Sequence, residues 1–189
     1  MENLSWNFAY NTGGFTQQEK VSLVEKLPDG EPKQAILRTL ADSQIRRGQY
    51  NQAMELLNNL PDSSERDGSV QRLGQQWAEH DSKAAAEWLK LQPDSSDRDL
   101  AVAGFANVLA RTDPQAALQW ADTIPDAGVK TGSLKNIALR WLTADSAAAE
   151  AWLTGTDALS DSDKKDVLDT SQSSGAERTT FGVNVSDRR

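Results

Sequence analysis

The chain has almost none of the histidine and cysteine side chains on which nucleophilic and acid–base catalysis often depends. His80 is the single histidine and there is no cysteine, which excludes a thiol nucleophile and a thiolate metal site. A histidine acts as a general base beside a nucleophile and an orienting carboxylate, and no residues at a matching spacing supply them. A hydrolase using His80 is one hypothesis, which retained activity of a His80→Ala variant would exclude. We expect instead a protein that is not an enzyme, with no catalytic residue, metal or cofactor.

The recurring aspartates have a structural explanation. Three of them follow one another at a constant interval, each just before an expected helix: Asp81, Asp113 and Asp145. Paired carboxylates serve some hydrolases, but identical placement along the chain predicts N-caps, whose oxygens accept the first free N–H groups of a helix. A second group resembles a calcium loop without its central glycine and terminal glutamate, and we interpret it as a solvated helix face: Asp161, Asp163, Asp166 and Asp169. No glycine-rich phosphate-binding motif is present.

These residues belong to an internal repeat. The dipeptide Pro-Asp recurs at almost constant intervals, beginning at Pro28, Pro61, Pro93 and Pro125. After each one, four mostly apolar or small residues share one helix face at offsets 0, 3, 4 and 7, starting at Leu37, Val70, Val102 and Leu134. An alanine and a large residue four positions later then mark a second helix. The spacing predicts four repeats of two helices each, at 28–60, 61–92, 93–124 and 125–156.

The two ends of the chain depart from the repeat. Residues 1–27 are expected to form an N-terminal cap, in which Thr16 and Glu19 make a capping box that opens a helix. Before that helix, large apolar residues alternate with smaller or polar ones, which is typical of a short strand. Residues 157–169 are expected to form a capping helix, and the Ser/Thr-rich residues 170–189 a mobile polar tail. The fold class predicted is all-α.

Tryptophan is abundant and follows the repeat. Five of the six tryptophans occupy positions that the repeat turns inward: Trp77, Trp88, Trp120, Trp141 and Trp152. An aromatic cage for a cationic ligand would also use this residue type. Because the rings recur with the repeat and face alanines, we favour packing in the core over ligand binding.

Helix pairs of this size resemble tetratricopeptide repeats (the TPR family). The first repeat matches the spacing of that family most fully, at Leu37, Leu40, Ala41, Gly48, Tyr50, Ala53 and Leu57. Leu73-Gly74 followed by Trp77 in the second repeat matches the first-helix signature, and the resemblance covers about residues 33–156. It implies a right-handed α-α solenoid of about four helix-turn-helix repeats with terminal capping segments.

The resemblance also implies a groove lined by the first helix of each repeat. In each first helix, the residues one, five and nine positions after the first residue of the apolar pattern (Leu37, Val70, Val102 or Leu134) would face a bound peptide. The polar members are Arg38, Asp42, Arg46, Gln71, Gln75, Glu79, Asn107, Arg111, Lys135 and Thr143, with Ala103 and Leu139 at the same positions. Such a mixture suits the main chain and carboxylates of an extended peptide. A solvated polar face is the alternative interpretation of each single residue.

Composition limits the partners. The chain of 189 residues has a formal net charge of -8, which argues against a non-specific nucleic-acid binder. No apolar run is long enough for a membrane span and no secretory signal is visible, so the expected location is cytoplasmic. We therefore predict a non-catalytic scaffold that binds another protein or an extended peptide. The alternative is an acidic surface that occupies a basic partner, as an inhibitor or nucleic-acid mimic does.

Overall fold

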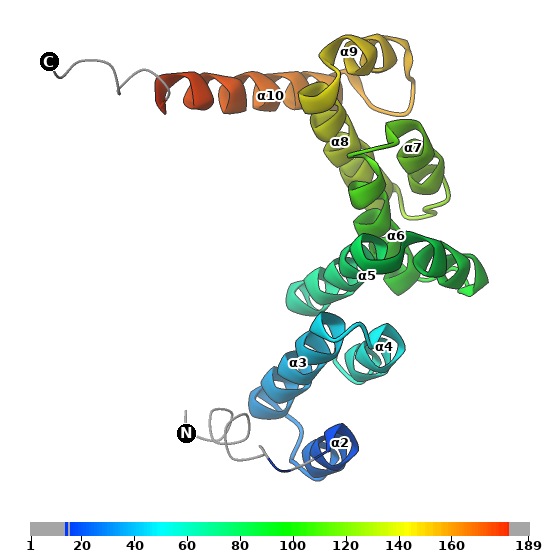
Figure 1. Ribbon diagram of the computed structural model, residues 1–189, viewed down its shortest axis with the longest axis vertical. Helices are drawn as coiled ribbons and strands as arrows, with labels where there is room; N and C mark the ends of the chain where they lie inside the picture. Colours follow the sequence, from blue (N-terminus) through cyan, green and yellow to red (C-terminus); the bar gives the residue numbers. More distant parts are fainter. Residues whose placement is uncertain (1–13, 15, 182–189) are drawn as a thin grey trace, which may run out of the picture. The chain divides into compact units, whose positions relative to one another are not determined.

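The computed structural model describes residue 14 and residues 16–181, and these contain helices and loops without a strand. The all-α prediction is confirmed for this part of the chain, whereas the predicted N-terminal strand lies outside it. The helices in chain order are α2 (Gln17–Glu25), α3 (Glu31–Arg46), α4 (Tyr50–Asn58), α5 (Ser64–Leu91), α6 (Ser96–Leu109), α7 (Pro114–Asp122), α8 (Ala127–Ala144), α9 (Ser146–Gly155) and α10 (Asp161–Phe181) (Figure 1). Within the described residues, no helix combines the length and the apolar character that crossing a membrane requires.

The chain forms two compact units, Met1–Pro93 (unit 1) and Asp94–Arg189 (unit 2). In unit 1, α3 packs against α4 and α5, and α2 packs against α3. In unit 2, α8 contacts α6, α7, α9 and α10. The core of unit 2 combines many alanines with a few large side chains, among them Leu134, Ile137 and Trp141. Small residues on one helix let the large side chains of the next approach closely.

The three recurring aspartates act as predicted, as helix N-caps. The Asp113 carboxylate accepts from the backbone N–H of Ala116 at 2.9 Å, and Asp145 accepts from Ala148 at 3.1 Å. Asp81 lies inside α5 with φ −150° and ψ 86°, which are not helical angles. It also accepts from the third residue after it, so α5 is two helices that meet at Asp81.

The other helix starts also use local polar caps. The side chains of Ser63, Ser95 and Asp126 each accept from the backbone N–H three residues later. Thr16 forms the predicted capping box with Glu19, whose pKa is lowered by its hydrogen bonds from the Thr16 backbone and hydroxyl. Each cap accepts a hydrogen bond from a backbone N–H group of the first turn that has no partner within the helix. The caps therefore fix where each new helix starts along the chain.

The C-terminus of α3 depends on a glycine. The N–H of Gly48 donates to the carbonyl of Ile45 at 3.0 Å, and the N–H of Gln49 donates to that of Gln44 at 2.9 Å. This pair of bonds is the Schellman motif, in which the first residue beyond the cap adopts a left-handed conformation. Gly48 has φ +73°, where a side chain would be strained.

Replacing Gly48 by alanine should lower the free energy of unfolding by about 1 kcal/mol through this strain. The space is sufficient, because an added Cβ would lie 3.9 Å from the His80 ring and from Tyr50. Gly68 provides a control of opposite sign: it lies inside α5 with open space around it, and Gly68→Ala should stabilise by about 1 kcal/mol. Urea unfolding of both variants measures the difference, and a neutral Gly48→Ala would contradict the strain.

The tryptophans are less buried than the repeat pattern indicates. Trp141 is buried at 8% exposure, whereas Trp77, Trp88, Trp120 and Trp152 are half-buried. Each of these rings nevertheless packs against another ring. Trp77 stacks on Tyr50 with centroids 4.8 Å apart, and Trp120 meets Phe105 edge-on at 4.9 Å. Among the aromatic side chains that the structure describes, Phe105 is the most deeply buried, at 1% exposure.

α10 is longer than the predicted capping helix, which was expected to end at residue 169. The structure continues it through Phe181, into the segment predicted to be a mobile tail. Hydroxyl groups in this segment bond to carbonyls one turn earlier: Thr170 to Asp166 at 2.7 Å and Ser173 to Asp169 at 2.6 Å. These side chains are satisfied within the helix, so a Ser/Thr-rich composition does not end it. Residues 182–189 of the predicted tail lie outside the described part.

Candidate functional site

Three of the predicted groove residues bond to the next long helix of the same unit: Asp42, Asn107 and Lys135. Asp42 on α3 pairs with Arg72 on α5 at 2.7 Å. Asn107 on α6 accepts a hydrogen bond from Arg140 on α8. These bonds join consecutive long helices, as does the ion pairing of Lys135 described below. A side chain that bonds to a second helix is less available to a ligand. Part of the predicted groove therefore stabilises the packing of the helices.

Other predicted residues bond within their own helix or are buried. Gln75 donates to Glu79 at 3.4 Å, and the Thr143 hydroxyl donates to the Leu139 carbonyl at 3.1 Å. Ala103 has 4% exposure and belongs to the core, so it cannot face a groove. Leu139 is partly buried against the core of unit 2.

Arg38 and Gln71 are half-buried polar residues of unit 1 whose side chains make no hydrogen bond or ion pair with described residues. The charge of Arg38 reaches Glu65 across α3 and α5. The pKa of Glu65 is lowered mainly by its own backbone N–H and by the Ser63 hydroxyl, and Arg38 adds to this effect. Arg38 and Gln71 are therefore the members of the predicted set that unit 1 leaves without a short-range partner, together with Arg46.

The structure brings Arg46 together with Glu79 in one pocket of about 260 Å³. Its walls come from the end of α3, the turn that follows, the start of α4 and the end of the first half of α5. The lining residues are Ile45, Arg46, Arg47, Gly48, Tyr50, Gln76, Glu79 and His80. Sequence reasoning identified Arg46, Glu79 and His80 separately, but it missed their convergence and it missed Arg47.

Hydrogen bonds connect the residues of one wall of this pocket. Tyr50 is 7% exposed, and its hydroxyl donates to the Gln76 carbonyl at 3.1 Å. Burial raises the pKa of Tyr50, and the nearby charge of Glu79 raises it further, so the phenol stays protonated. Gln76 in turn donates to Glu79 at 2.8 Å. These bonds hold the acidic side of the pocket in place.

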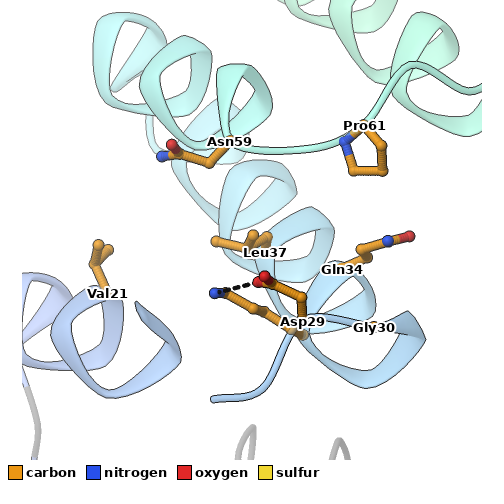
Figure 2. Close-up of a pocket in the computed structure, with 8 residues that line it drawn as sticks. Val21, Asp29, Gly30, Gln34, Leu37, Asn59 and Pro61 are labelled. Atoms are coloured by element: carbon orange, nitrogen blue, oxygen red, sulfur yellow. Dashed lines mark hydrogen bonds and ion pairs between the residues drawn. The ribbon is translucent and has the colours of Figure 1, made fainter. Parts of the chain in front are cut away.

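A second pocket, of about 400 Å³, lies in unit 1 over the first turns of α3 (Figure 2). Figure 2 shows Leu37 of α3 at the centre of the view, Val21 of α2 to its left, and Asn59 and Pro61 of the connection after α4 above it. Lys33 is paired with Asp29 at 2.9 Å at its edge. Apolar walls with amides at the rim suit a peptide side chain, but the basic group here is already neutralised.

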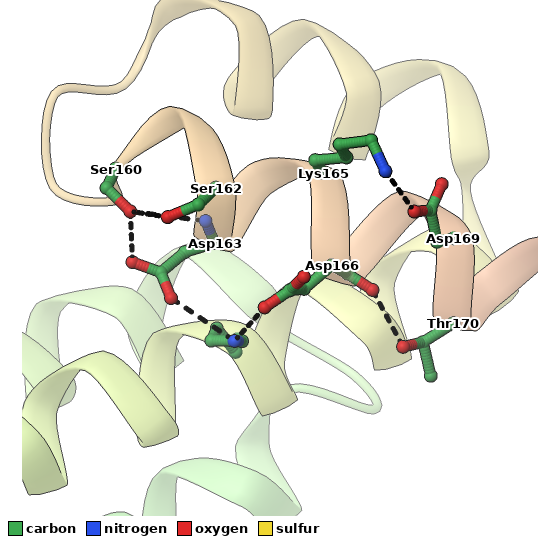
Figure 3. Close-up of polar contacts among 8 residues, drawn as sticks. Ser160, Ser162, Asp163, Lys165, Asp166, Asp169 and Thr170 are labelled. Carbon is green, nitrogen blue, oxygen red and sulfur yellow. Dashed lines mark hydrogen bonds and ion pairs between the residues drawn. The ribbon is translucent and has the colours of Figure 1, made fainter.

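The acidic residues near the C-terminal end take part in a polar network in unit 2 (Figure 3). The ammonium group of Lys135 on α8 donates to Asp163 at 3.2 Å and to Asp166 at 3.1 Å, both on α10. Asp163 also accepts from the Ser160 hydroxyl. Two of the aspartates interpreted as a solvated helix face thus bind a lysine of the neighbouring helix. Among the described residues, no three histidine or acidic side chains are placed to hold a metal ion.

This network predicts a pH dependence for the docking of α10. The hydrogen bond from Ser160 and then that from Lys135 lower the pKa of Asp163 below 3.8, so its contribution is present above pH 3.8 and is lost as the pH falls through the folded-state pKa. Hydrogen bonds to Asp166 and Asp163 raise the pKa of Lys135 above 10.5, so its contribution is present below pH 10.5 and is lost as the pH rises further.

Carbon-13 NMR shifts of residues 161–173 should therefore report a stable helix between pH 3.8 and pH 10.5, with fraying as the pH falls below the first value or rises above the second. Lys135→Gln should fray the start of α10 within that range as well. Lys165→Gln is the matched control, because Lys165 pairs with Asp169 at 2.8 Å on α10 itself and should leave docking unchanged. Equal effects of the two substitutions would contradict this assignment.

Comparison with known proteins adds no relative. No family model, no curated protein and no solved structure matches the chain. The resemblance to tetratricopeptide repeats therefore rests on the sequence pattern and stays a prediction.

Proposed function

We propose that the chain is a non-catalytic helical-repeat module, a TPR-like right-handed α-α solenoid, that binds another protein or an extended peptide. One observation carries the proposal. Arg46 and Glu79, which belong to successive repeats and were both predicted to face a ligand, line a single pocket at the ends of neighbouring helices. The recurrence of caps at Asp81, Asp113 and Asp145 supports the repeat on which the proposal depends.

The binding surface we propose is narrower than the full set of groove positions. It contains the predicted residues of unit 1 whose side chains make no hydrogen bond or ion pair within the described part of the chain: Arg38, Arg46 and Gln71. An extended peptide offers N–H and C=O groups along its length, and polar side chains of this kind can form hydrogen bonds with them. Asp42, Asn107 and Lys135 are assigned to the fold instead, because each one bonds to the next helix.

A displayed library of random peptides tests this function. Peptides selected on the intact chain should lose most of their affinity for an Arg38→Glu and Gln71→Ala double variant. They should keep it for Lys83→Glu, which changes the charge of an exposed lysine on the second half of α5. Unfolding midpoints of all variants show that they are folded. Selected peptides that bind the double variant as tightly as the wild type would exclude this surface.

A second candidate function is favoured by the aspartates that follow the repeated prolines. The side chains of Asp29, Asp62 and Asp94 are 97%, 99% and 77% exposed, although each lies within 4 Å of a basic group. Such recurring exposed carboxylates could occupy a basic partner. Salt separates the two functions: binding through exposed carboxylates should weaken steeply from low to physiological ionic strength, and binding through the α3–α5 surface should weaken less.

A further inference from the structure

We propose that the pocket over the first turns of α3 binds the indole ring of Trp6, a residue of the same chain that precedes α2 and lies outside the described part. The contact closes the first repeat from within the chain, and it does not depend on the peptide-binding surface proposed above. Its evidence is the construction of the pocket, the polar groups at its rim and the length of chain that connects Trp6 with it.

The pocket lies where the cover of the first repeat is incomplete (Figure 2). Val21 of α2, Leu37 of α3 and Pro61 after α4 give it three apolar sides. α2, α4 and α5 all pack against α3, yet they leave a pocket of about 400 Å³ beside its first turns. A terminal repeat needs a capping segment because no neighbouring repeat covers its outer face. The volume is within the range that holds a small molecule, so one aromatic side chain fits.

The rim of the pocket favours a neutral ring that carries one hydrogen-bond donor. The charged lining residues that the structure describes, Asp29 and Lys33, neutralise each other at 2.9 Å. The side-chain amide of Asn59 donates to the Glu55 carbonyl at 3.1 Å, which leaves its own carbonyl oxygen as an acceptor. The Gln34 side chain makes no hydrogen bond with described residues and offers a second acceptor. An indole N–H only donates, and it needs such a partner when it is buried.

The chain supplies such a ring close to the pocket. Large apolar residues alternate in the segment before α2: Leu4, Trp6, Phe8 and Tyr10. Of these, Trp6 combines the largest ring with a donor. Ten residues along the chain, Thr16 caps α2, and ten residues span at most about 33–36 Å. Val21 follows five residues later, a rise of about 7.5 Å along the helix, so the ring can reach the pocket.

The covalent connection makes even a weak contact effective. A short linker gives the two groups that it joins an effective concentration of about 1 mM. A contact with a dissociation constant of about 0.1 mM is then occupied about ten to one. The same occupancy excludes a competing ligand. A peptide that carries this ring should therefore bind about 10-fold more weakly to the wild type than to a chain that lacks the Trp6 ring.

Methyl NMR of the full chain tests the contact. An aromatic ring shifts the resonances of methyl groups that lie against it, so Trp6→Ala should move those of Val21 and Leu37 most. The methyl resonances of Leu153, in unit 2, should stay unchanged. Phe8→Ala is the matched control from the same segment, and it should leave the Val21 and Leu37 resonances near their wild-type positions.

A synthetic peptide with the sequence of residues 1–12 tests the same contact in trans. It should bind the Trp6→Ala chain about 10-fold more tightly than the wild type and return the two sets of methyl resonances toward their wild-type positions. A peptide with Trp6→Ala should not bind, and one with Trp6→Phe should bind more weakly because it lacks the donor. Adding Gln34→Leu and Asn59→Leu to the Trp6→Ala chain should remove this preference for tryptophan, whereas adding Lys83→Gln should keep it.

Several results would overturn the contact. They are unchanged Val21 and Leu37 resonances in Trp6→Ala, equal changes in Phe8→Ala, and equal affinity of the peptide for the wild-type and Trp6→Ala chains. Wild-type resonances of Val21 and Leu37 that move on dilution would show that a second copy supplies the ring, which excludes closure within one chain. None of these measurements involves Arg38 or Gln71, so the peptide-binding surface is tested separately.

Discussion

Replacing Phe105 by alanine should lower the free energy of unfolding of unit 2 by about 3–5 kcal/mol. Phe105 lies on α6 with 1% exposure and is the largest fully buried side chain among the described residues of unit 2. Its ring meets Trp120 of α7 edge-on at a centroid distance of 4.9 Å. The substitution removes the apolar contact between the two helices and leaves a cavity that the surrounding alanines are too short to fill.

The cost of Phe105→Ala should be compared with that of Trp120→Ala, which changes the other ring of the same pair. The repeat pattern places Trp120 in the core, but the structure leaves it half-buried against the core of unit 2. Its removal should therefore cost about 2 kcal/mol, less than the removal of the smaller Phe105. Native-state hydrogen exchange of the amides of α6 and α8 gives the opening free energy of unit 2 alone. A greater loss for Trp120→Ala than for Phe105→Ala would contradict the observed burial.

The helices themselves were predictable because their signals are local. Apolar residues at helical spacing define a face, and Asp113 or Asp145 caps a helix by reaching a backbone N–H only three residues away. Neither signal depends on how two helices pack. The extension of α10 was missed because Thr170 and Ser173 resemble loop residues until their hydroxyls are seen to bond to carbonyls of the same helix.

The candidate site was less predictable because it depends on the rotation of each helix about its axis. Lys135 occupies the same repeat position as Arg38 and Gln71, yet it bonds to side chains of the next long helix whereas they do not. Asp42 and Asn107 share the position of Gln75, and they too bond to the next long helix, whereas Gln75 bonds within its own. A small rotation decides between a ligand-facing residue and an interhelix bond, and repeat spacing does not specify it. The pocket at Arg46 and Arg47 also needs the turn at Gly48, which sets the end of α3 against α5.

Basic residues near the start of successive long helices recur with the repeat, and their role was not predicted: Arg66, Arg98 and Lys130. Each donates to a carbonyl near the C-terminal end of a shorter helix, namely that of Leu57, Thr123 and Asp122 respectively. A cation there satisfies orphan carbonyls and complements the negative end of the helix dipole. Arg66 and Lys130 therefore cap the shorter helix that precedes their own, whereas Arg98 caps α7, which follows its own helix.

Arg66→Ala should accordingly lower the free energy of unfolding of unit 1 by about 3 kcal/mol. Arg66 is 6% exposed, and its Nε donates to the Leu57 carbonyl at 2.9 Å. Alanine leaves that carbonyl without its donor and opens space where the side chain lay. The ion pair with Asp62 contributes little to this value, because the two groups are 3.8 Å apart and the Asp62 side chain is 99% exposed.

Two further variants assign the loss to the buried hydrogen bond. Arg66→Met keeps most of the apolar stem and removes only the donor, so it should lose less than alanine does. Arg98→Ala, 32 residues later, removes a longer bond of 3.1 Å to Thr123 and the charge 3.8 Å from the buried Asp99 carboxylate, and should cost about 2 kcal/mol. Hydrogen exchange in each unit measures the three values. If Arg98→Ala cost as much as Arg66→Ala, charge at the helix end rather than burial of the donor would control the stability of the helix pairs.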